Sequence, residues 1–267
     1  MRRHSIDVKD GRVFAVSAGS GDALLMLHGW PLDHRMFDRQ LDALSDQFRV
    51  VAIDRRGFGQ SSAPPNMGEE LSDIDRIIDE LDLGQVHLLG VSQGGRLALR
   101  YAASRPSRVK SLILLGAVVD GLDVTEPDEE KIPVAEYASL AQDGKLGDVV
   151  EHWSAHTMMQ MPGGATAQKQ LVSDMLEAYG GKDLVNFDAS HYRFDGDILG
   201  ALAVSRQQVL LLTGEYETDA RKLHARAIEE RVPNSKEVII RGGGHLSNLT
   251  HPEPFNAAIR DFCSRVA

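Results

Sequence analysis

The chain has 267 residues, of which 42% are hydrophobic and 25% charged, the composition of an ordinary globular protein long enough for one sizeable α/β domain. Its net charge of −10 argues against a nucleic-acid partner, because phosphate binding needs clustered Lys and Arg. The N-terminus lacks the apolar stretch of a signal peptide, and no window is apolar for long enough to span a bilayer. The single cysteine, Cys263, rules out an intramolecular disulfide and fits a reducing compartment. We therefore expect a soluble, cytoplasmic protein with no nucleic-acid or membrane partner.

The predicted elements alternate along the chain between short apolar runs and helical patterns. Most of the runs are continuously apolar, as in strands that are covered on both faces of a parallel sheet. In chain order the elements are strands 12–18 and 23–29, helix 36–48, strand 49–54, helix 70–81, strand 85–91, helix 94–104, strands 109–116 and 208–214, helix 219–230, strand 236–242 and helix 252–263. This alternation predicts an α/β fold with a doubly wound, mostly parallel sheet.

One segment interrupts this pattern. Residues 120–202 contain helical patterns but no convincing strand, and glycine pairs and prolines punctuate them. The segment is too long for a loop in a compact domain, so we expect a helical insertion, here called the cap segment, in a core made of residues 1–119 and 203–267.

The cap segment also carries the negative charge. Residues 120–192 hold 14 Asp and Glu, four Lys and no Arg, a net charge of −10, so the rest of the chain balances to zero. Such asymmetry suggests two regions under different constraints, although a peripheral insertion with more surface would also carry more charge.

The strongest motif is VHLLGVSQGGRLAL, where an apolar run leads through Gly90-Val91-Ser92-Gln93-Gly94 directly into a helical pattern. Gly-x-Ser-x-Gly between a strand and a helix is typical of a nucleophile elbow, which holds a serine hydroxyl at the edge of the sheet. Side chains at Gly90 and Gly94 would collide in so tight a turn, and Ser92 is expected in a strained conformation. The motif predicts a serine nucleophile.

Three other stretches accompany the elbow. They are MLHGWPLD (26–33), AIDRRGFGQSS (52–62) and GGGHLSNLTHPEPF (242–255), each after a predicted strand. Over about residues 13–262 the chain resembles the α/β-hydrolase superfamily of serine hydrolases, whose members carry His-Gly-x, Asp-x-Arg-Gly-x-Gly-x-Ser and a histidine loop in these places. It is most similar to the enol-lactonase and esterase-like branch. The resemblance implies the α/β-hydrolase fold with a helical cap.

The resemblance also implies site residues. A serine hydroxyl needs a base that takes its proton during attack, and the resemblance assigns this role to His245. His251 is a nearby rival, but it precedes a proline at a helix start and is more typical of a capping or packing residue. The oxyanion would be bound by the backbone N–H groups of Trp30 and Gln93. His28 is expected to hydrogen-bond the backbone and shape its loop.

The base in turn needs a carboxylate at its other ring nitrogen, which fixes the tautomer and stabilises the imidazolium. Relatives usually carry Gly-x-x-Asp after the strand that follows the cap. Here Gly214 is that glycine and the acid position falls on Glu217, one methylene longer than the usual aspartate. Asp219 remains an alternative, with a competing role in the first turn of a helix, and so does Asp120, because a minority of relatives place the acid there. Glu215 is expected to be solvated.

Other residues allow two interpretations. Trp153, Met158 and Met159 line an apolar substrate pocket, or pack the cap segment on the core, or do both. His152 and His156 have the i, i+4 spacing of a zinc helix but lack the HExxH motif and a third ligand. The glycines near Ser92 and in residues 57–59 complete no nucleotide-binding motif. We therefore expect no metal and no cofactor.

These observations predict a hydrolase that cleaves an ester or lactone of a small-molecule substrate through an acyl-enzyme, with Ser92, His245 and Glu217 as its triad. The same residues would also serve carbon–carbon bond hydrolysis or cofactor-free perhydrolysis, and the fold could instead belong to a ligand-binding signalling protein. Residues 120–192 of the cap segment are acidic and contain no arginine, which predicts a neutral, partly apolar substrate, because they would repel the carboxylates of typical enol-lactones.

Overall fold

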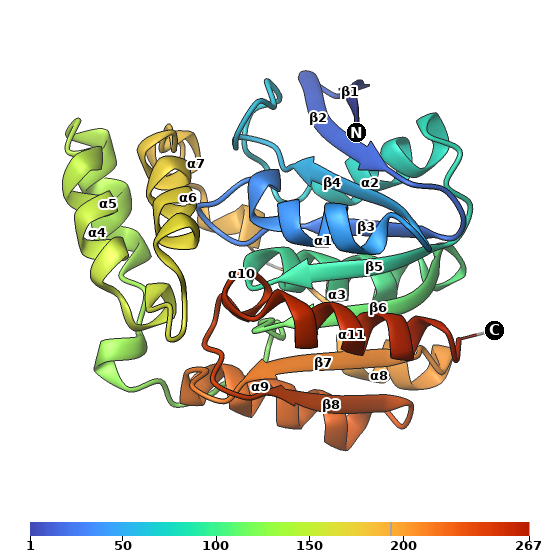
Figure 1. The fold of residues 1–267 in the computed structure, drawn as a ribbon. Helices are drawn as coiled ribbons and strands as arrows, with labels where there is room; N and C mark the ends of the chain where they lie inside the picture. The colour runs from blue at the N-terminus through green and yellow to red at the C-terminus, as the bar shows by residue number, and fades with distance from the viewer. Residues whose placement is uncertain (193, 267) are drawn as a thin grey trace.

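The computed structural model describes residues 1–192 and 194–266 (Figure 1). In this part of the chain the strands form one sheet in the order β1-β2-β4-β3-β5-β6-β7-β8. β1 pairs antiparallel with β2, β2 pairs antiparallel with β4, and all other neighbours are parallel. The strands are β1 Arg2–Val8, β2 Gly11–Ala18, β3 Ala23–Leu27, β4 Arg49–Asp54, β5 Val86–Val91, β6 Val109–Leu115, β7 Val209–Gly214 and β8 Ser235–Ile240. The predicted doubly wound, mostly parallel sheet is confirmed.

Strand β1 is the one element of the sheet that the sequence analysis missed. Its residues are mostly polar and exposed, and only Ile6 is buried, so it lacks the apolar run of the other strands. Its pairing Val8↔Gly11 closes a two-residue turn in which Asp10 has φ 63°. The two turn residues are Lys9 and Asp10, and the Asp-Gly dipeptide at 10–11, a general signal of a turn, was the available signal.

Helices cover both faces of the sheet because successive side chains of a strand point to opposite sides. Leu24 and Met26 of β3 pack with α1 and α11, whereas Leu25 and Leu27 pack with α2, α3, α8 and α9. In Figure 1, α1 and α11 lie in front of the sheet. The helices are α1 Asp38–Leu44, α2 Glu70–Glu80, α3 Gln93–Ser104, α8 Ile198–Ser205, α9 Asp219–Arg231 and α11 Pro252–Cys263, with the short turns η1 His34–Phe37, η2 Pro106–Arg108 and α10 Ser247–Thr250.

Between β6 and β7 the described chain forms helices and no strand. The elements are η3 Asp128–Glu130, α4 Val134–Gln142, α5 Leu146–Ala155, η4 Thr157–Met159, α6 Thr166–Glu177, α7 Lys182–Val185, η5 Ala189–Tyr192 and then α8. In Figure 1, α4 to α7 stand beyond the end of the sheet to which the arrow of β5 points. Helix α8 crosses the predicted boundary at residue 202 and packs on α3 and α9, so its residues flank the sheet.

None of the described helices has the length and apolar character needed to cross a membrane.

Candidate active site

Ser92 occupies a strained turn between β5 and α3. Its φ of 53° and ψ of −115° are unusual for a residue with a side chain, and such strain often marks functional sites. The two motif glycines permit this turn. A Cβ on Gly90 would lie 2.4 Å from the carbonyl oxygen of Gly94, and a Cβ on Gly94 would lie 2.2 Å from that of Leu27. The local geometry is therefore that of the predicted nucleophile elbow.

His245 and Glu217 meet through the loops that follow β8 and β7. Nδ1 of His245 lies 2.8 Å from Oε2 and 3.0 Å from Oε1 of Glu217, and both side chains are buried. Oε1 also accepts a hydrogen bond of 2.8 Å from the backbone N–H of Thr218. Burial alone raises the pKa of Glu217, but the charge and hydrogen bond of His245 and the Thr218 N–H together hold that pKa below its ordinary value. The carboxylate is therefore ionised and oriented toward the imidazole.

This pair lies over the end of β6, the strand next to β5. A Cβ on Gly116, directly after β6, would lie 2.5 Å from Cε1 of His245 and 2.9 Å from Oε2 of Glu217. The backbone N–H of Ser92 donates to the carbonyl oxygen of Leu115 at 2.8 Å. The structure thus brings Ser92, His245 and Glu217 to neighbouring strand ends at the same edge of the sheet.

The other candidate acids have different partners. Asp120 accepts two hydrogen bonds from Arg100, at 2.7 and 3.0 Å, whereas the carboxylate paired with the imidazole of His245 is that of Glu217. Asp219 is exposed at the first position of α9. Glu215 is exposed, as predicted for a solvated residue. Its Oε2 also accepts from the backbone N–H of Gly242 at 2.8 Å and so joins the loop after β7 to the loop after β8.

The remaining predicted histidines are held by other groups. Nε2 of His28 accepts from the backbone N–H of Arg55 at 2.9 Å, so its Nδ1 donates to the carbonyl oxygen of Gly29 at 2.9 Å. Burial and the charge of Arg55 lower the pKa of His28 to about 4, which keeps the ring neutral in this loop-shaping role. Nδ1 of His251 lies 2.8 Å from the hydroxyl of Thr250.

The two predicted oxyanion donors, Trp30 and Gln93, both border the cavity that contains Ser92. The loop of Trp30 passes close to Ser92, since a Cβ on Gly29 would lie 3.3 Å from Cβ of Ser92. Gln93 is the first residue of α3, and its side-chain oxygen accepts from Nη1 of Arg55 at 2.8 Å. The side chain of Gln93 is thereby fixed, and its backbone N–H remains at the start of the helix.

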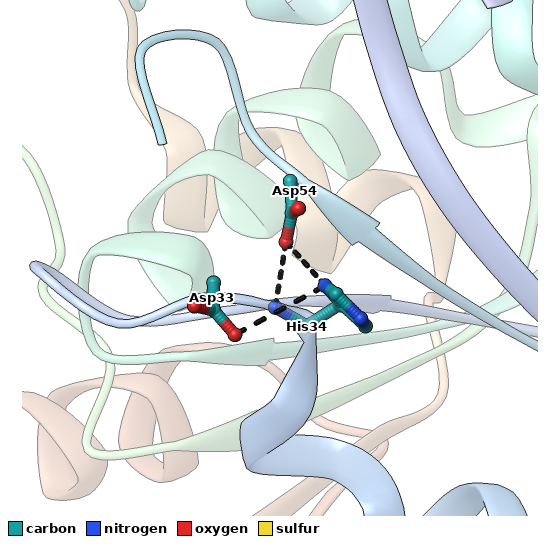
Figure 2. A group of neighbouring side chains, drawn as sticks. All are labelled: Asp33, His34 and Asp54. Atoms are coloured by element: carbon teal, nitrogen blue, oxygen red, sulfur yellow. Dashed lines mark hydrogen bonds and ion pairs between the residues drawn. The ribbon is translucent and has the colours of Figure 1, made fainter. Parts of the chain in front are cut away.

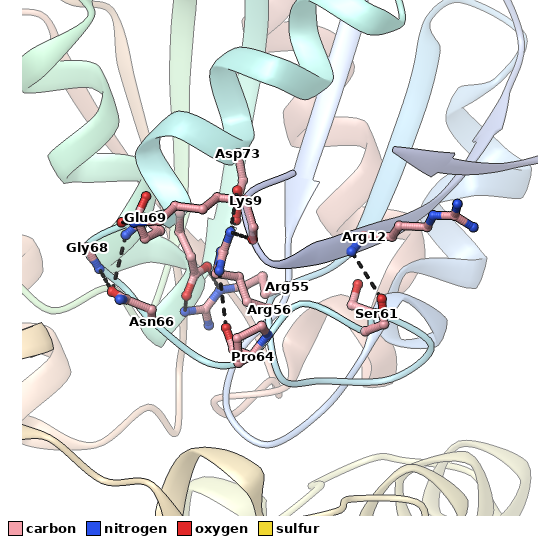
Figure 3. Close-up of polar contacts among 12 residues, drawn as sticks. Lys9, Arg12, Arg55, Arg56, Ser61, Pro64, Asn66, Gly68, Glu69 and Asp73 are labelled. Carbon is pink, nitrogen blue, oxygen red and sulfur yellow. Dashed lines mark hydrogen bonds and ion pairs between the residues drawn. The ribbon is translucent and has the colours of Figure 1, made fainter. Parts of the chain in front are cut away.

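The loop that follows β4 is held by two buried arginines. Arg55 forms a bidentate salt bridge with Glu70, from Nε to Oε2 at 2.7 Å and from Nη2 to Oε1 at 2.9 Å. Arg56 pairs with Asp73 and donates to the carbonyl oxygens of Lys9 and Pro64, as Figure 3 shows. Bidentate salt bridges restrict the side chains of both partners, so Arg55 is held in place to donate to the side-chain oxygen of Gln93.

A second buried cluster shapes the loop after β3. Asp33, His34 and Asp54 are close enough together to suggest a metal site (Figure 2). However, Oδ1 of Asp54 accepts from both Nδ1 and the backbone N–H of His34, at 2.7 and 2.8 Å. Asp33 pairs with Arg35 at 2.7 Å. These donors and acceptors already bind one another, so the cluster is an ion-pair network that joins the loops after β3 and β4.

Ser92 opens into a cavity of about 360 Å³ between the sheet edge and the cap segment. This volume suits a small-molecule ligand, and its wall includes the aromatic side chains of Trp30, Tyr137 and Trp153. Of the three predicted pocket residues, Trp153 is therefore part of the wall. Met158 is buried in the apolar core, and Met159 borders a second cavity of about 740 Å³.

Two arginines that were not predicted also border the Ser92 cavity. Arg96 and Arg221 come from the core, whereas the acids of the wall, Glu126 and Asp183, come from the cap segment. Nη1 of Arg221 donates to Glu126 at 3.3 Å. The four lysines of the cap segment are all exposed, and the charged side chains of the wall balance. Each arginine stands one helical turn after a candidate catalytic residue, Ser92 or Glu217, and that spacing was the available signal.

Comparison with known proteins agrees with this fold. The family model described as alpha/beta hydrolase fold matches residues 22–252. The AB hydrolase superfamily protein YisY of Bacillus subtilis (strain 168) is 28% identical over 265 residues, covering 94% of each chain. A thermophilic esterase from Thermogutta terrifontis superposes with a TM-score of 0.80 at 23% identity, covering 100% of this chain and 99% of the other. A bromoperoxidase from Bacillus anthracis gives 0.80 at 24%, covering 98% and 100%.

The chain belongs to the alpha/beta hydrolase fold family, because the family model covers most of its length. The predicted superfamily is confirmed, and hydrolytic activity is consistent with these relatives.

Proposed function

We propose that the protein is a carboxylic ester hydrolase that uses Ser92, His245 and Glu217 as a catalytic triad. The observation that carries this proposal is the buried contact of 2.8 Å between Nδ1 of His245 and Glu217, beside the strained turn of Ser92. A carboxylate at Nδ1 keeps the proton on that nitrogen and leaves Nε2 free to accept a proton from serine.

The reaction proceeds in two steps. Oγ of Ser92 attacks the carbonyl carbon of an ester or lactone while Nε2 of His245 takes the hydroxyl proton. The backbone N–H groups of Trp30 and Gln93 stabilise the oxyanion, and the His245 proton passes to the leaving alkoxide as the acyl–oxygen bond breaks. A water molecule then gives a proton to His245 and attacks the acyl carbon, which releases the acid and restores Ser92. In a lactone the alcohol and acid products are the two ends of one molecule.

The substrate we propose is small, neutral and partly apolar. Its size follows from the cavity of about 360 Å³, and its apolar part would contact Trp30, Tyr137 and Trp153. Neutrality is supported by the balance of Arg96 and Arg221 against Glu126 and Asp183. Each arginine is close to an acid, at 3.3 Å for Arg221–Glu126 and 3.3 Å for Arg96–Asp120. A substrate carboxylate would have to compete with these acids.

Turnover of short-chain nitrophenyl esters tests the proposal. We expect the unmodified protein to hydrolyse them and the Ser92→Ala variant, with an unchanged circular dichroism spectrum, to be slower by about 10⁴-fold or more. Binding of such esters without turnover would favour a ligand-binding protein on the same fold. A substrate panel with peracids and with carbon–carbon-cleavable diketones distinguishes the alternative hydrolase and perhydrolase activities.

A further inference from the structure

The acidic cap segment turns some of its carboxylates toward the core. Glu126, Glu130 and Asp183 bond to groups of the core, and we call them the inward carboxylates. None of the three has a part in the proposed chemistry. Their core partners are Trp30, the proposed oxyanion donor, and the first turn of α9, which directly follows the loop of the proposed triad acid Glu217.

Asp183 holds the side chain of Trp30. Its Oδ2 accepts from the indole Nε1 of Trp30 at 2.8 Å, and its Oδ1 accepts from the hydroxyl of Tyr179 at 2.6 Å. The indole N–H also lies 3.1 Å from the Tyr179 hydroxyl. Asp183 is buried, with an exposed fraction of 7%, so each of these bonds is shielded from water. A carboxylate suits the position because both of its oxygens accept, whereas an amide would turn an N–H₂ group toward one of the two donors.

Aromatic rings of the cap segment enclose the same indole. Tyr137 stacks on Trp30 with centroids 6.0 Å apart, while Trp153 and Tyr179 meet it edge-on at 4.8 and 5.8 Å. The cap segment therefore fixes the loop of Trp30 from one side. A turn within the loop also fixes it, because the backbone N–H of Leu32 donates to the carbonyl oxygen of Gly29 at 3.0 Å. Because the ring is immobilised, the peptide group that carries the Trp30 N–H has little freedom to rotate.

Glu130 binds the N-terminus of α9, which directly follows the loop of Glu217. Its two carboxylate oxygens accept from the backbone N–H groups of Asp219 and Ala220, each at 3.0 Å. These are the first two amides of α9, which have no partner inside the helix and favour a negative charge. The residue before them, Thr218, donates its N–H to Glu217 at 2.8 Å. Glu130 thus anchors the helix start that orients the triad acid.

Glu126 adds a third contact to the same helix. It accepts from Nη1 of Arg221, whose side chain is buried and whose Nε has no hydrogen-bond partner within the described residues. Without Glu126 this guanidinium would be a buried charge facing the catalytic cavity with no nearby acid bonded to it, so the contact is costly to remove.

We propose that the inward carboxylates are positioning residues through which the cap segment holds both halves of the catalytic machinery in place. Asp183 orients the oxyanion loop through Trp30, and Glu130, assisted by Glu126, orients Glu217 through the start of α9. This inference rests on the proposed function. It also explains why an acidic cap does not make the cavity negative, since the acids that reach inward are bonded to donors of the core.

The test compares substitutions of equal charge change on the same cap segment. Asp183→Asn and Glu130→Gln remove inward carboxylates, whereas Glu151→Gln and Asp143→Asn remove exposed ones. For a short-chain nitrophenyl ester we expect kcat to fall roughly 10- to 100-fold for the first pair while KM changes less than about threefold, because small misplacements near the reacting groups cost rate more than binding. We expect the second pair to stay within about twofold of the unmodified protein.

A double-mutant cycle separates positioning from general loss of stability. Trp30→Phe keeps a ring but removes the N–H that Asp183 accepts, so Trp30→Phe/Asp183→Asn should lose about as much kcat as the worse single variant. The chain has two tryptophans, so Trp30→Phe also assigns the indole N–H signals in a ¹H–¹⁵N spectrum. The Trp30 signal should exchange slowly with water in the unmodified protein and faster in Asp183→Asn.

Two outcomes would overturn the inference. One is a kcat above half of the unmodified value for both Asp183→Asn and Glu130→Gln, and the other is an equal loss in the exposed controls. Absence of Ser92-dependent turnover in the unmodified protein would instead overturn the proposed function, and this is measured before any cap variant is made.

Discussion

Replacing Glu217 by glutamine tests the least usual member of the proposed triad. In the folded protein Oε1 accepts from the Thr218 N–H at 2.8 Å, and Oε2 lies 2.8 Å from Nδ1 of His245. In Glu217→Gln the single amide oxygen will bind the Thr218 N–H, because turning the amide over would leave a buried donor unpaired at a cost of about 1–3 kcal/mol. The amide N–H₂ group then donates to Nδ1, so the imidazole proton is held on Nε2. A protonated Nε2 cannot accept the proton of Ser92.

The expected loss follows from these two effects. Restoring the active tautomer costs about 1–3 kcal/mol, or roughly 5- to 150-fold in rate. Loss of the negative charge next to the developing imidazolium adds to this, and the total in comparable triads is about 10⁴-fold, equivalent to about 5.4 kcal/mol. We therefore expect kcat/KM for a short-chain nitrophenyl ester to fall on the order of 10⁴-fold, with little change in the thermal midpoint.

Two other acids serve as controls for Glu217→Gln. Asp219→Asn changes an exposed side chain and should leave kcat/KM within about twofold. Asp120→Asn weakens the bonds to Arg100 and should lower stability more than activity. Glu217 is not the catalytic acid if Glu217→Gln keeps more than about a tenth of the activity, or if Asp120→Asn loses as much activity as Glu217→Gln at unchanged stability.

Three further results are expected. Gly116→Ala should lower kcat/KM at least about tenfold, because the new Cβ would lie 2.5 Å from the His245 ring. Gly121→Ala is the control: Gly121 also has a positive φ, but a Cβ there would have no atom within 4 Å, so kcat/KM should stay within about twofold. Burial lowers the pKa of His34, but the hydrogen bond and charge of Asp54 outweigh burial and raise this pKa above 6.5. The pair of His34 with Asp54 therefore stabilises the fold fully below pH 6.5, and this stabilisation is lost as the pH rises through the pKa of the folded state. His34→Gln should therefore destabilise more at pH 6 than at pH 9 in urea titrations, and an equal effect would contradict this reasoning. Of two matched esters, one neutral and one with a carboxylate, the neutral ester should have the higher kcat/KM at low salt, and a clear preference for the anionic one would exclude the proposed substrate class.

Local sequence patterns predicted the parts of the site that depend on neighbours in the chain. The apolar runs predicted the parallel strands, and the glycines around Ser92 predicted the turn. A Cβ on Gly90 would clash within the turn itself, whereas a Cβ on Gly94 would clash with the end of β3. The resemblance to relatives with Gly-x-x-Asp after this strand favoured Glu217 over Asp219 and Asp120, and it is Glu217 that contacts His245. Strand β1 was missed because its pairing with β2 depends on backbone bonds and buries little apolar surface.

The contacts between the cap segment and the core could not be predicted in this way. Asp183 and Trp30 are 153 residues apart, and Glu130 and Asp219 are 89 apart, so no periodicity or local motif relates them. Met158 and Met159 illustrate the same limit. Their apolar character predicts burial, but the cap segment has more than one buried side, and sequence alone does not say which of them faces the Ser92 cavity.

Covalent labelling is the most direct test of whether Ser92 is the nucleophile. The unmodified protein would be treated with an alkyl organophosphonate carrying a good leaving group, and the adduct located by mass spectrometry of proteolytic peptides. If Ser92 is the nucleophile, one adduct forms, on Ser92, with loss of esterase activity in proportion to labelling, and no adduct forms at this position in Ser92→Ala. An active protein that is inactivated through a different residue, or that keeps its activity when Ser92 is fully modified, would contradict this assignment.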